Sequence, residues 1–225
     1  MADNKTLQPI KLWGRIGPNP PKVSILLEEL SLPYEIVDVA WSEVKSPAYV
    51  AVNPNGRLPA IHDPNTNLTL WESGAIIEYL IERYDTQHTL SFAPGSNESH
   101  LAKQWLFFQT TGQGPYYGQA VWFKRGDPEN KVAIERYINE IHRVSGVVEG
   151  HLVAQGKEGG EGSDGPWLVG GRISYADLAW LPWQRVISKF LSTEEYDVAK
   201  YPAMAAWLAK IQEREAVKKV LATLG

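Results

Sequence analysis

The sequence contains no cysteine, which excludes disulfide frameworks, cysteine-ligated zinc sites and a cysteine nucleophile. Any thiol chemistry must therefore use a thiol that comes from another molecule. No run of about 18 apolar residues occurs, and the N-terminal segment MADNKTLQPIKLWG lacks the apolar core of a secretion signal. These absences favour a cytoplasmic protein that does not insert into a membrane.

The sequence also lacks a basic block, and its formal net charge is −4. Nucleic acid and anionic membranes are therefore not expected as partners. The five histidines are dispersed and no H-E-x-x-H motif occurs, so no metal cofactor is expected. Nine Trp, ten Tyr and five Phe exceed what a core needs, which suggests that some of them line a pocket or a subunit interface.

The first part of the chain alternates between strand and helix patterns. Apolar runs that end at Gly, Pro, Asn or Asp predict strands, and apolar residues at helical spacing predict helices. The expected strands are residues 10–13, 34–39, 58–62 and 68–71, and the expected helices are residues 22–30, 47–52 and 72–84. This order is the thioredoxin arrangement.

Only helical patterns follow after this part. The predicted helices cover residues 98–123, 128–155, 174–190, 203–212 and 214–223. The sequence thus divides into a thioredoxin-like domain at residues 1–84, a Thr-, Ser-, Pro- and Gly-rich linker at 85–97, and an all-helical domain at 98–225.

Two features of the helical part are predicted to be structural. The segment GKEGGEGSDGPW is expected to be a mobile surface loop because it is poor in apolar residues. Its glycines could suggest a phosphate-binding loop, but no G-K-[ST] follows and the segment does not join a strand to a helix. Ser174 and Asp177 form an S-x-x-D capping box, so their replacement should affect folding before chemistry.

Two motifs in the first part of the chain predict a ligand-binding site. NPNGRLPAI covers residues 53–61, and LWESGAIIEYL covers residues 70–80. Their sequence and spacing resemble the glutathione site of the glutathione transferase superfamily, and the resemblance extends over nearly the whole chain. It implies an α/β thioredoxin-like N-terminal domain with an all-α C-terminal helical bundle, and glutathione as a cosubstrate.

The resemblance assigns roles to residues of these two motifs. It implies a cis peptide between Leu58 and Pro59, which exposes the Leu58 amide and carbonyl to the cysteinyl backbone of glutathione. This pairing resembles an added antiparallel strand. Ser73 and its N–H are implied to receive the γ-glutamyl carboxylate, as the first turn of a helix can, while Glu72 takes the α-amino group.

The candidate catalytic residue is Asn19. The segment after the first strand offers no Tyr, Ser or Cys, and G-P-N-x-x-K-V resembles the branch of the yeast nitrogen-regulatory prion protein and the bacterial glutathione-dependent disulfide reductases. An amide cannot act as a base, so Asn19 is expected to hold and polarise the glutathione thiolate; its alternative role is a helix-capping turn residue. Gly17 stands where bacterial members carry a threonine, so one hydroxyl donor is missing.

Six further residues are candidates for ligand contacts, and each has a structural alternative. Lys45 is a candidate for the glycyl carboxylate, or else a solvated lysine. Arg143 aligns with an arginine that reaches glutathione from the partner subunit, or else forms a surface ion pair. Four aromatic residues lie where the family's second-substrate pocket opens, although core packing is the alternative for each: Tyr116, Tyr117, Trp122 and Phe123.

The expected function is a glutathione transferase enzyme that acts in detoxification by conjugating glutathione to hydrophobic electrophiles. The alternative enzyme is a glutathione-dependent disulfide reductase or peroxidase, which uses the same thiolate. A regulatory glutathione-binding protein is the alternative without catalysis, but the long Asn/Gln-rich tail of the yeast prion protein has no counterpart here. The family also implies a homodimer.

Overall fold

The computed structural model describes residues 7–158 and 165–224, which form two compact units. The first unit runs to Thr86 and includes the chain from Glu215 onward. The second unit is Gln87–Arg214.

A four-stranded mixed sheet forms the centre of the first unit. Its strands are β1 (Ile10–Trp13), β2 (Tyr34–Val37), β3 (Ala60–Asp63) and β4 (Leu68–Trp71). The spatial order is β2-β1-β3-β4, in which β1 runs parallel to β2, and β3 runs antiparallel to both β1 and β4. This sheet confirms the thioredoxin-like fold. The strands expected at 34–39 and 58–62 are shifted or shortened at their ends.

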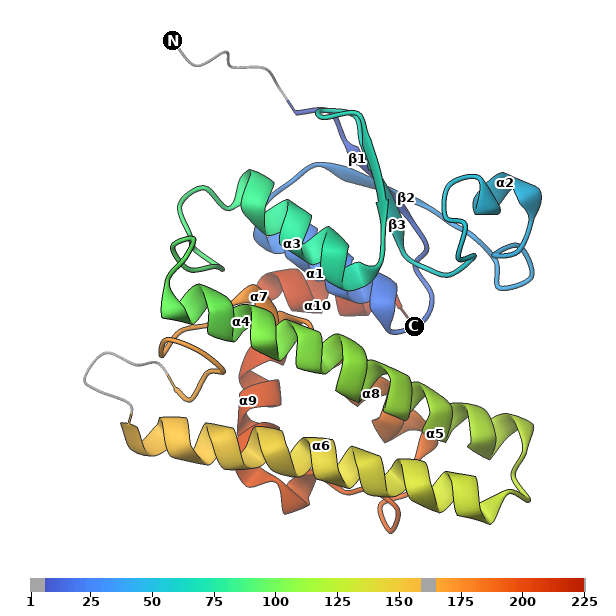
Figure 1. The fold of residues 1–225 in the computed structure, drawn as a ribbon, viewed down its shortest axis with the longest axis vertical. Helices are drawn as coiled ribbons and strands as arrows, with labels where there is room; N and C mark the ends of the chain where they lie inside the picture. The colour runs from blue at the N-terminus through green and yellow to red at the C-terminus, as the bar shows by residue number, and fades with distance from the viewer. Residues whose placement is uncertain (1–6, 159–164, 225) are drawn as a thin grey trace. The chain divides into compact units, whose positions relative to one another are not determined.

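The helices of the first unit are α1 (Asn19–Glu29), α2 (Pro47–Val50), α3 (Ser73–Tyr84) and α10 (Glu215–Ala222). Figure 1 shows α1 and α3 side by side against the sheet, whereas α2 lies on its other side. Apolar side chains of α1 and α3, such as Val23, Leu27 and Ile76, are fully buried. Burial of this stripe accounts for the helical periodicity in the sequence.

The last helix, α10, packs against α1 within the first unit. Val217 and Val220 are buried, and the Lys219 ammonium lies 2.7 Å from a Glu28 carboxylate oxygen. The sequence pattern places this helix in the domain 98–225, but its contacts group it with the first unit. The domain limits at 84 and 97 stay predictions.

The second unit consists of helices, as expected. They are α4 (Asn97–Phe108), the π-helical turn η1 (Gln109–Gln113), α5 (Gly114–Gly126), α6 (Lys131–Glu158), α7 (Tyr175–Leu178), α8 (Leu181–Phe190), the 3₁₀ turn η2 (Val198–Lys200) and α9 (Pro202–Gln212). α6 runs alongside α5 (Figure 1). None of the described helices is long and apolar enough to cross a membrane.

The helix expected at 98–123 contains the π-helical turn. Within it the Gln109 amide donates to the Gln113 side-chain oxygen at 2.8 Å, and the Gln113 amide donates to the Trp180 carbonyl at 3.1 Å. The buried Gln113 side chain thus accepts from Gln109 and donates to Trp180 where the regular hydrogen-bond ladder changes.

The helix expected at 174–190 divides into α7 and α8. Its start is the predicted capping box: the Ser174 N–H and hydroxyl donate to an Asp177 carboxylate oxygen at 2.8 and 2.9 Å. The other Asp177 oxygen accepts from the Leu168 N–H and the Trp207 indole N–H. Asp177 therefore ties three segments of the helical unit together. Of the predicted mobile loop GKEGGEGSDGPW, residues 159–164 lie outside the described residues.

Candidate active site

The strand register brings the two predicted motifs to one end of the sheet. Trp13, the last residue of β1, pairs with Ala60, the first residue of β3, and Ala60 pairs with Trp71, the last residue of β4. Trp13 also pairs with Val37, the last residue of β2. The segments that follow β1, β2 and β4, and the segment that precedes β3, therefore all leave the sheet at the same end.

The turn before β3 is fixed by internal hydrogen bonds. Asn53 is 1% exposed, and its amide donates to the Arg57 carbonyl at 2.6 Å while its oxygen accepts from the Asn55 N–H at 2.9 Å. The Tyr49 hydroxyl also donates to the Arg57 carbonyl, at 2.8 Å. The Tyr49 hydroxyl is protonated at neutral pH like that of any tyrosine, and burial raises its pKa further. The turn thus presents the next residue, Leu58, in one fixed conformation.

The predicted cis peptide between Leu58 and Pro59 is present. The Leu58 side chain packs with Val44 and Tyr49. Its main-chain N–H and carbonyl make no hydrogen bond to any other described residue. An unpaired main-chain edge next to a strand is what an extended peptide ligand requires.

Gly14 makes room for Leu58. It follows β1 with φ +99°, and its N–H donates to the Val37 carbonyl at 3.0 Å. A Cβ atom at this position would lie 2.9 Å from both terminal methyl groups of Leu58. Only glycine fits this close approach without displacing Leu58.

Glu72 and Ser73 lie where β4 passes into α3. Glu72 has φ +74°, a conformation that costs about 1–3 kcal/mol in a residue with a side chain and that clusters at functional sites. Ser73 is the first residue of α3 and is 6% exposed. No side chain caps this helix, and the Ser73 hydroxyl has no hydrogen-bond partner among the described residues. Amides of the first turn and this hydroxyl are the groups that bind a carboxylate at a helix N-terminus.

Asn19 is the first residue of α1, and the N-cap position before it is Pro18. No side chain caps α1, and its first turn holds no acidic residue. The Asn19 side chain is half-buried. It thus occupies the expected place, in the segment that follows β1 at the same end of the sheet as Leu58 and Ser73. The role in holding a thiolate stays a prediction.

The other predicted ligand contact of the first unit is Lys45. Its ammonium group donates to the Asn55 carbonyl at 2.7 Å, so the side chain lies across the turn that leads to Leu58. It is exposed and retains two further N–H donors. The position agrees with a role in binding a ligand carboxylate, which stays a prediction.

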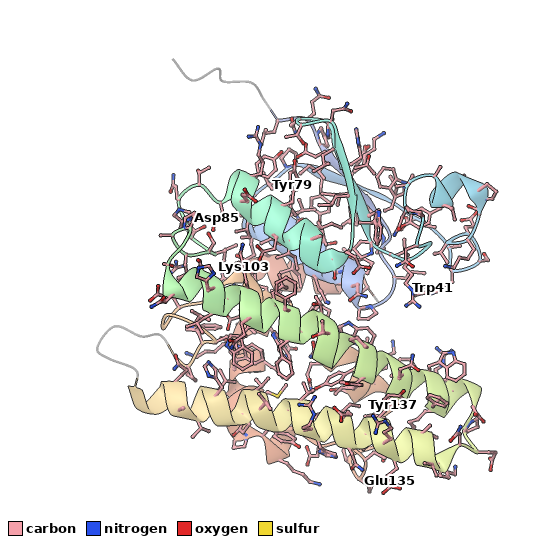
Figure 2. All side chains as sticks on the ribbon, viewed as in Figure 1. Trp41, Tyr79, Asp85, Lys103, Glu135 and Tyr137 are labelled. Carbon is pink, nitrogen blue, oxygen red and sulfur yellow. The ribbon has the colours of Figure 1, made fainter. Side chains whose placement is uncertain are left out.

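Three residues near these segments carry no role in the sequence-based prediction. Lys22, in the first turns of α1, is 2% exposed. Burial lowers the pKa of Lys22 to about 7, and the charge of Glu72 opposes this decrease. Trp41, labelled in Figure 2, is 60% exposed after β2, and a Cβ at Gly17 would lie 3.2 Å from its ring. Arg57, exposed beside Leu58, adds a positive charge.

Lys22 is the lysine of the G-P-N-x-x-K-V motif, but the motif does not indicate that its side chain is buried, and no pattern indicates the Trp41 contact. A lysine within an amphipathic helix normally reaches solvent, and Trp41 meets Gly17 only through the fold. For Arg57 the sequence did contain an indication, because the segment NGR places an arginine directly before Leu58.

The aromatic residues predicted for the second-substrate pocket belong to α5. Phe123 stacks on Tyr137 with ring centroids 5.6 Å apart, and Tyr116 lies 6.3 Å from the same ring. Trp122 is 58% exposed. Tyr117 is fully buried, and its hydroxyl lies 3.3 Å from the Ser145 hydroxyl.

The pocket role of these four residues stays a prediction. For Tyr117 it would require exposure of a side chain that packs in the core of the helical unit.

Arg143 lies on α6 and forms an i,i+3 ion pair in which its Nε is 2.8 Å from a Glu140 carboxylate oxygen. This is the surface pairing named as its alternative, and the contact with glutathione across a subunit interface stays a prediction. The described residues contain no group of three or more His, Asp or Glu side chains arranged to hold a metal ion.

Comparison with known proteins yields two family matches along the chain. Residues 8–82 match the glutathione S-transferase N-terminal domain, and residues 116–223 match the glutathione S-transferase C-terminal domain. The glutathione S-transferase-like protein gedE of Aspergillus terreus is 59% identical over 97% of this chain and 96% of its own length.

Two solved structures are similar over the full fold. The glutathione transferase URE2P8 of Phanerochaete chrysosporium, solved with oxidized glutathione, is 38% identical, with a TM-score of 0.87 over 98% of this chain and 96% of its own. Ure2p in complex with glutathione is 34% identical, with a TM-score of 0.87 over 96% of this chain and 100% of its own.

Proposed function

The chain belongs to the glutathione S-transferase family, and from this premise we propose that it binds glutathione as a thiolate and transfers it to hydrophobic electrophiles. The observation that carries the proposal is the register Trp13–Ala60–Trp71. Because of this register, three features lie at the same end of one sheet. They are the start of α1 with Asn19, the unpaired main chain of Leu58, and the start of α3 with Ser73, and neither helix start has a side-chain cap.

Each part of glutathione meets a matching group in this arrangement. The γ-glutamyl carboxylate binds Ser73 and the first-turn amides of α3, and the α-amino group binds Glu72. The cysteinyl backbone pairs with Leu58, which fixes the position of the sulfur relative to the sheet. The glycyl carboxylate extends toward Lys45. URE2P8 and Ure2p, which were solved with forms of glutathione, support the choice of ligand.

Activation of the thiol falls to Asn19 and the start of α1. A free thiol has a pKa of about 8.5, so the anion must be favoured by about 2 kcal/mol to bring this value near 7. One amide donor supplies about 1.5–3 kcal/mol when its acceptor is charged, and the positive end of a helix adds about 0.3–1 kcal/mol. The two together suffice. The thiolate then attacks the electrophilic carbon, the carbon–sulfur bond forms and the leaving group departs.

A second candidate is reduction of disulfides by glutathione, because a close structural relative was solved with oxidized glutathione. The same thiolate would attack a sulfur atom of a mixed disulfide, and a second glutathione would complete the exchange. The candidate without catalysis is a regulatory binding protein, which the likeness to the nitrogen regulation fragment of the yeast prion protein Ure2p supports.

The test is a turnover assay of the full chain with glutathione and two acceptors, chlorodinitrobenzene and hydroxyethyl disulfide. The expected result is a faster rate with the aryl halide, after subtraction of the uncatalysed rate. A dominant rate with the disulfide would replace the transferase by the reductase. Binding of glutathione without turnover of either acceptor would favour the regulatory protein, and absence of binding would reject all three.

A further inference from the structure

The helical unit contains a cleft between α8 and α9. Its volume is about 370 Å³, near the lower limit of the cavities that hold small ligands. The two helices contact each other, and every residue that lines the cleft belongs to the helical unit. None of these residues is part of the proposed glutathione site, so the cleft needs an explanation of its own.

The buried part of the cleft lining is apolar except for one amide side chain. Leu181 of α8 and Leu208 of α9 are buried, and Gln184, three residues after Leu181, is 3% exposed. The Gln184 Nε2 donates to the Tyr196 hydroxyl at 2.7 Å, and that hydroxyl lies 3.0 Å from the Ser145 hydroxyl. The nitrogen of this amide is therefore held by a buried hydrogen-bond network.

The oxygen of the same amide has no partner. Gln184 Oε1 is buried and accepts no hydrogen bond from any described residue. Most buried side-chain polar atoms have a partner, because an unpaired acceptor loses its hydration without compensation. A leucine or methionine would fill a similar volume without this cost. Gln184 thus offers the cleft an acceptor that the N–H or O–H group of a ligand can satisfy.

The exposed edge of the cleft is positively charged. Arg185, Ser188 and Lys189 lie on the same face of α8 as Leu181 and Gln184, at the spacing of helical neighbours. Arg185 and Lys189 are exposed, and neither has an ion-pair partner among the described residues. None of the residues that line the cleft is acidic. Two unpaired cations beside one cleft, in a chain of net charge −4, favour an anionic ligand.

We propose that the cleft between α8 and α9 is a second ligand site, which binds a small carboxylate with an apolar body and a hydrogen-bond donor. The carboxylate binds Arg185 and Lys189, the apolar body covers Leu181 and Leu208, and the donor satisfies Gln184 Oε1. Binding forms and breaks no covalent bond. The site uses no residue of the proposed glutathione site, so a molecule can occupy it while glutathione is bound.

The experiment is calorimetry of the full chain with three probes that differ by one group each. They are 3-(4-hydroxyphenyl)propanoate, 3-phenylpropanoate and the uncharged 3-phenylpropanol. Each titration is done with and without excess S-methylglutathione, which occupies the proposed glutathione site. The hydroxylated carboxylate should bind most tightly, with the same affinity in both conditions. Loss of the hydroxyl should weaken binding about two- to tenfold. Loss of the carboxylate should weaken it about tenfold, because two exposed ion pairs are lost and each is worth up to about fivefold.

Variants assign each of these effects to its residue. Gln184→Leu should bind both carboxylates equally, because it has no acceptor for the hydroxyl, and it should fold, because Tyr196 keeps Ser145 as its partner. The double variant Arg185→Gln, Lys189→Gln should bind the two carboxylates about tenfold more weakly and 3-phenylpropanol as the wild type does. Arg136→Gln is the matched control, because Arg136 is an exposed arginine on α6 without an ion-pair partner among the described residues. It should bind all three probes as the wild type does.

The inference would be overturned by a wild type that binds none of the probes at millimolar concentration. Equal affinities for the three probes, or unchanged affinities in both cleft variants, would overturn it as well. If Gln184→Leu fails to fold by circular dichroism, Ala205→Leu decides, since it narrows the cleft from α9 and should weaken all three probes. Unchanged binding by that variant would place the probes elsewhere. A chain that does not bind S-methylglutathione would reject the proposed function and leave this test intact.

Discussion

Replacement of Asn19 separates its proposed chemical role from its position at a helix start. If the amide holds the thiolate, Asn19→Ala should raise the pKa of bound glutathione by about one to two units, because a hydrogen bond to a charged group is worth about 1.5–3 kcal/mol. The same free energy corresponds to a loss of about 10- to 150-fold in kcat at a fixed pH below the thiol pKa. Affinity for glutathione should change little, since Leu58 and Ser73 bind the remainder of the molecule.

The aspartate variant sharpens this test. α1 has no acidic residue in its first turn and no side-chain cap. A carboxylate in place of Asn19 should stabilise the helix by about 0.3–1 kcal/mol through its dipole. The same carboxylate should repel the thiolate and raise its pKa further than alanine does. A purely structural Asn19 predicts that Asn19→Asp is at least as stable and at least as active as the wild type. A thiolate-binding Asn19 predicts a protein at least as stable but less active than either the wild type or Asn19→Ala.

The assay is the ultraviolet absorbance of the bound thiolate against pH for the wild type and both variants, with melting temperatures measured on the same samples. Coincidence of the three titration curves would refute the role of the side chain. Activation would then come from another donor, such as a main-chain amide of α1, while the fold and the binding site would be unaffected.

Four further outcomes are expected, the first three from the described contacts and the last from the family resemblance. Glutathione at about 100 times its Kd should stabilise the wild type by about 2.7 kcal/mol, and Ser73→Ala should lose most of the resulting shift in melting temperature; an equal shift in both would contradict the carboxylate site. Gly14→Ala should displace Leu58 and lower glutathione affinity in calorimetry along with stability, because its Cβ would lie 2.9 Å from two methyl groups. Asp177→Ala leaves four donors without an acceptor and should lower the free energy of unfolding in urea by about 3 kcal/mol or more, with a loss of 1 kcal/mol or less arguing against this network. Sedimentation should give a dimer at micromolar concentration, whereas a monomer would remove the role offered for Arg143.

The first unit was largely predictable because its elements are short and clearly delimited. β1 and β4 have the bounds that their apolar runs predict, since turn residues flank both. One difference from the prediction lies at the start of a helix. α1 starts three residues earlier than its apolar face, because Pro20 and Pro21 fit the first turn of a helix.

The sequence predicted that the second unit is helical, but not where its helices are interrupted or which helices pack together. The turn η1 has the sequence QTTGQ, which contains no apolar residue, so the apolar pattern does not indicate its π-helical hydrogen bonds or the contact of Gln109 with Gln113. Periodicity likewise shows that α10 has an apolar face but not which helix covers it. Its partner is α1, distant in sequence.

The proposed glutathione site was predictable from the sequence because it depends on the backbone. Particular residue types are needed at the Leu58–Pro59 peptide, at Gly14 with its φ of +99° and at Ser73, where α3 starts. A requirement for one residue type at one position can be recognised in the sequence as a motif. Lys22 lies in the G-P-N-x-x-K-V motif, but its burial depends on the packing of α1 against its neighbours, which the motif does not show.

Recognition of the second substrate follows a different physical rule. An apolar pocket discriminates by volume, and one methylene group changes the free energy of binding by only about 1–3 kcal/mol. Exposed aromatic side chains such as Trp41 and Trp122 can each contribute contact area to many electrophiles without requiring one backbone conformation. Trp41 differs from Trp122 in one respect: its ring lies against Gly17, two residues before Asn19, so it borders the segment that is to hold the sulfur. An electrophile bonded to that sulfur would have to lie within reach of this segment, whichever class of acceptor is preferred. Comparison of chlorodinitrobenzene with hydroxyethyl disulfide would therefore report the chemistry at the proposed thiolate, whereas the range of aryl acceptors that are turned over would report the surface around Trp41.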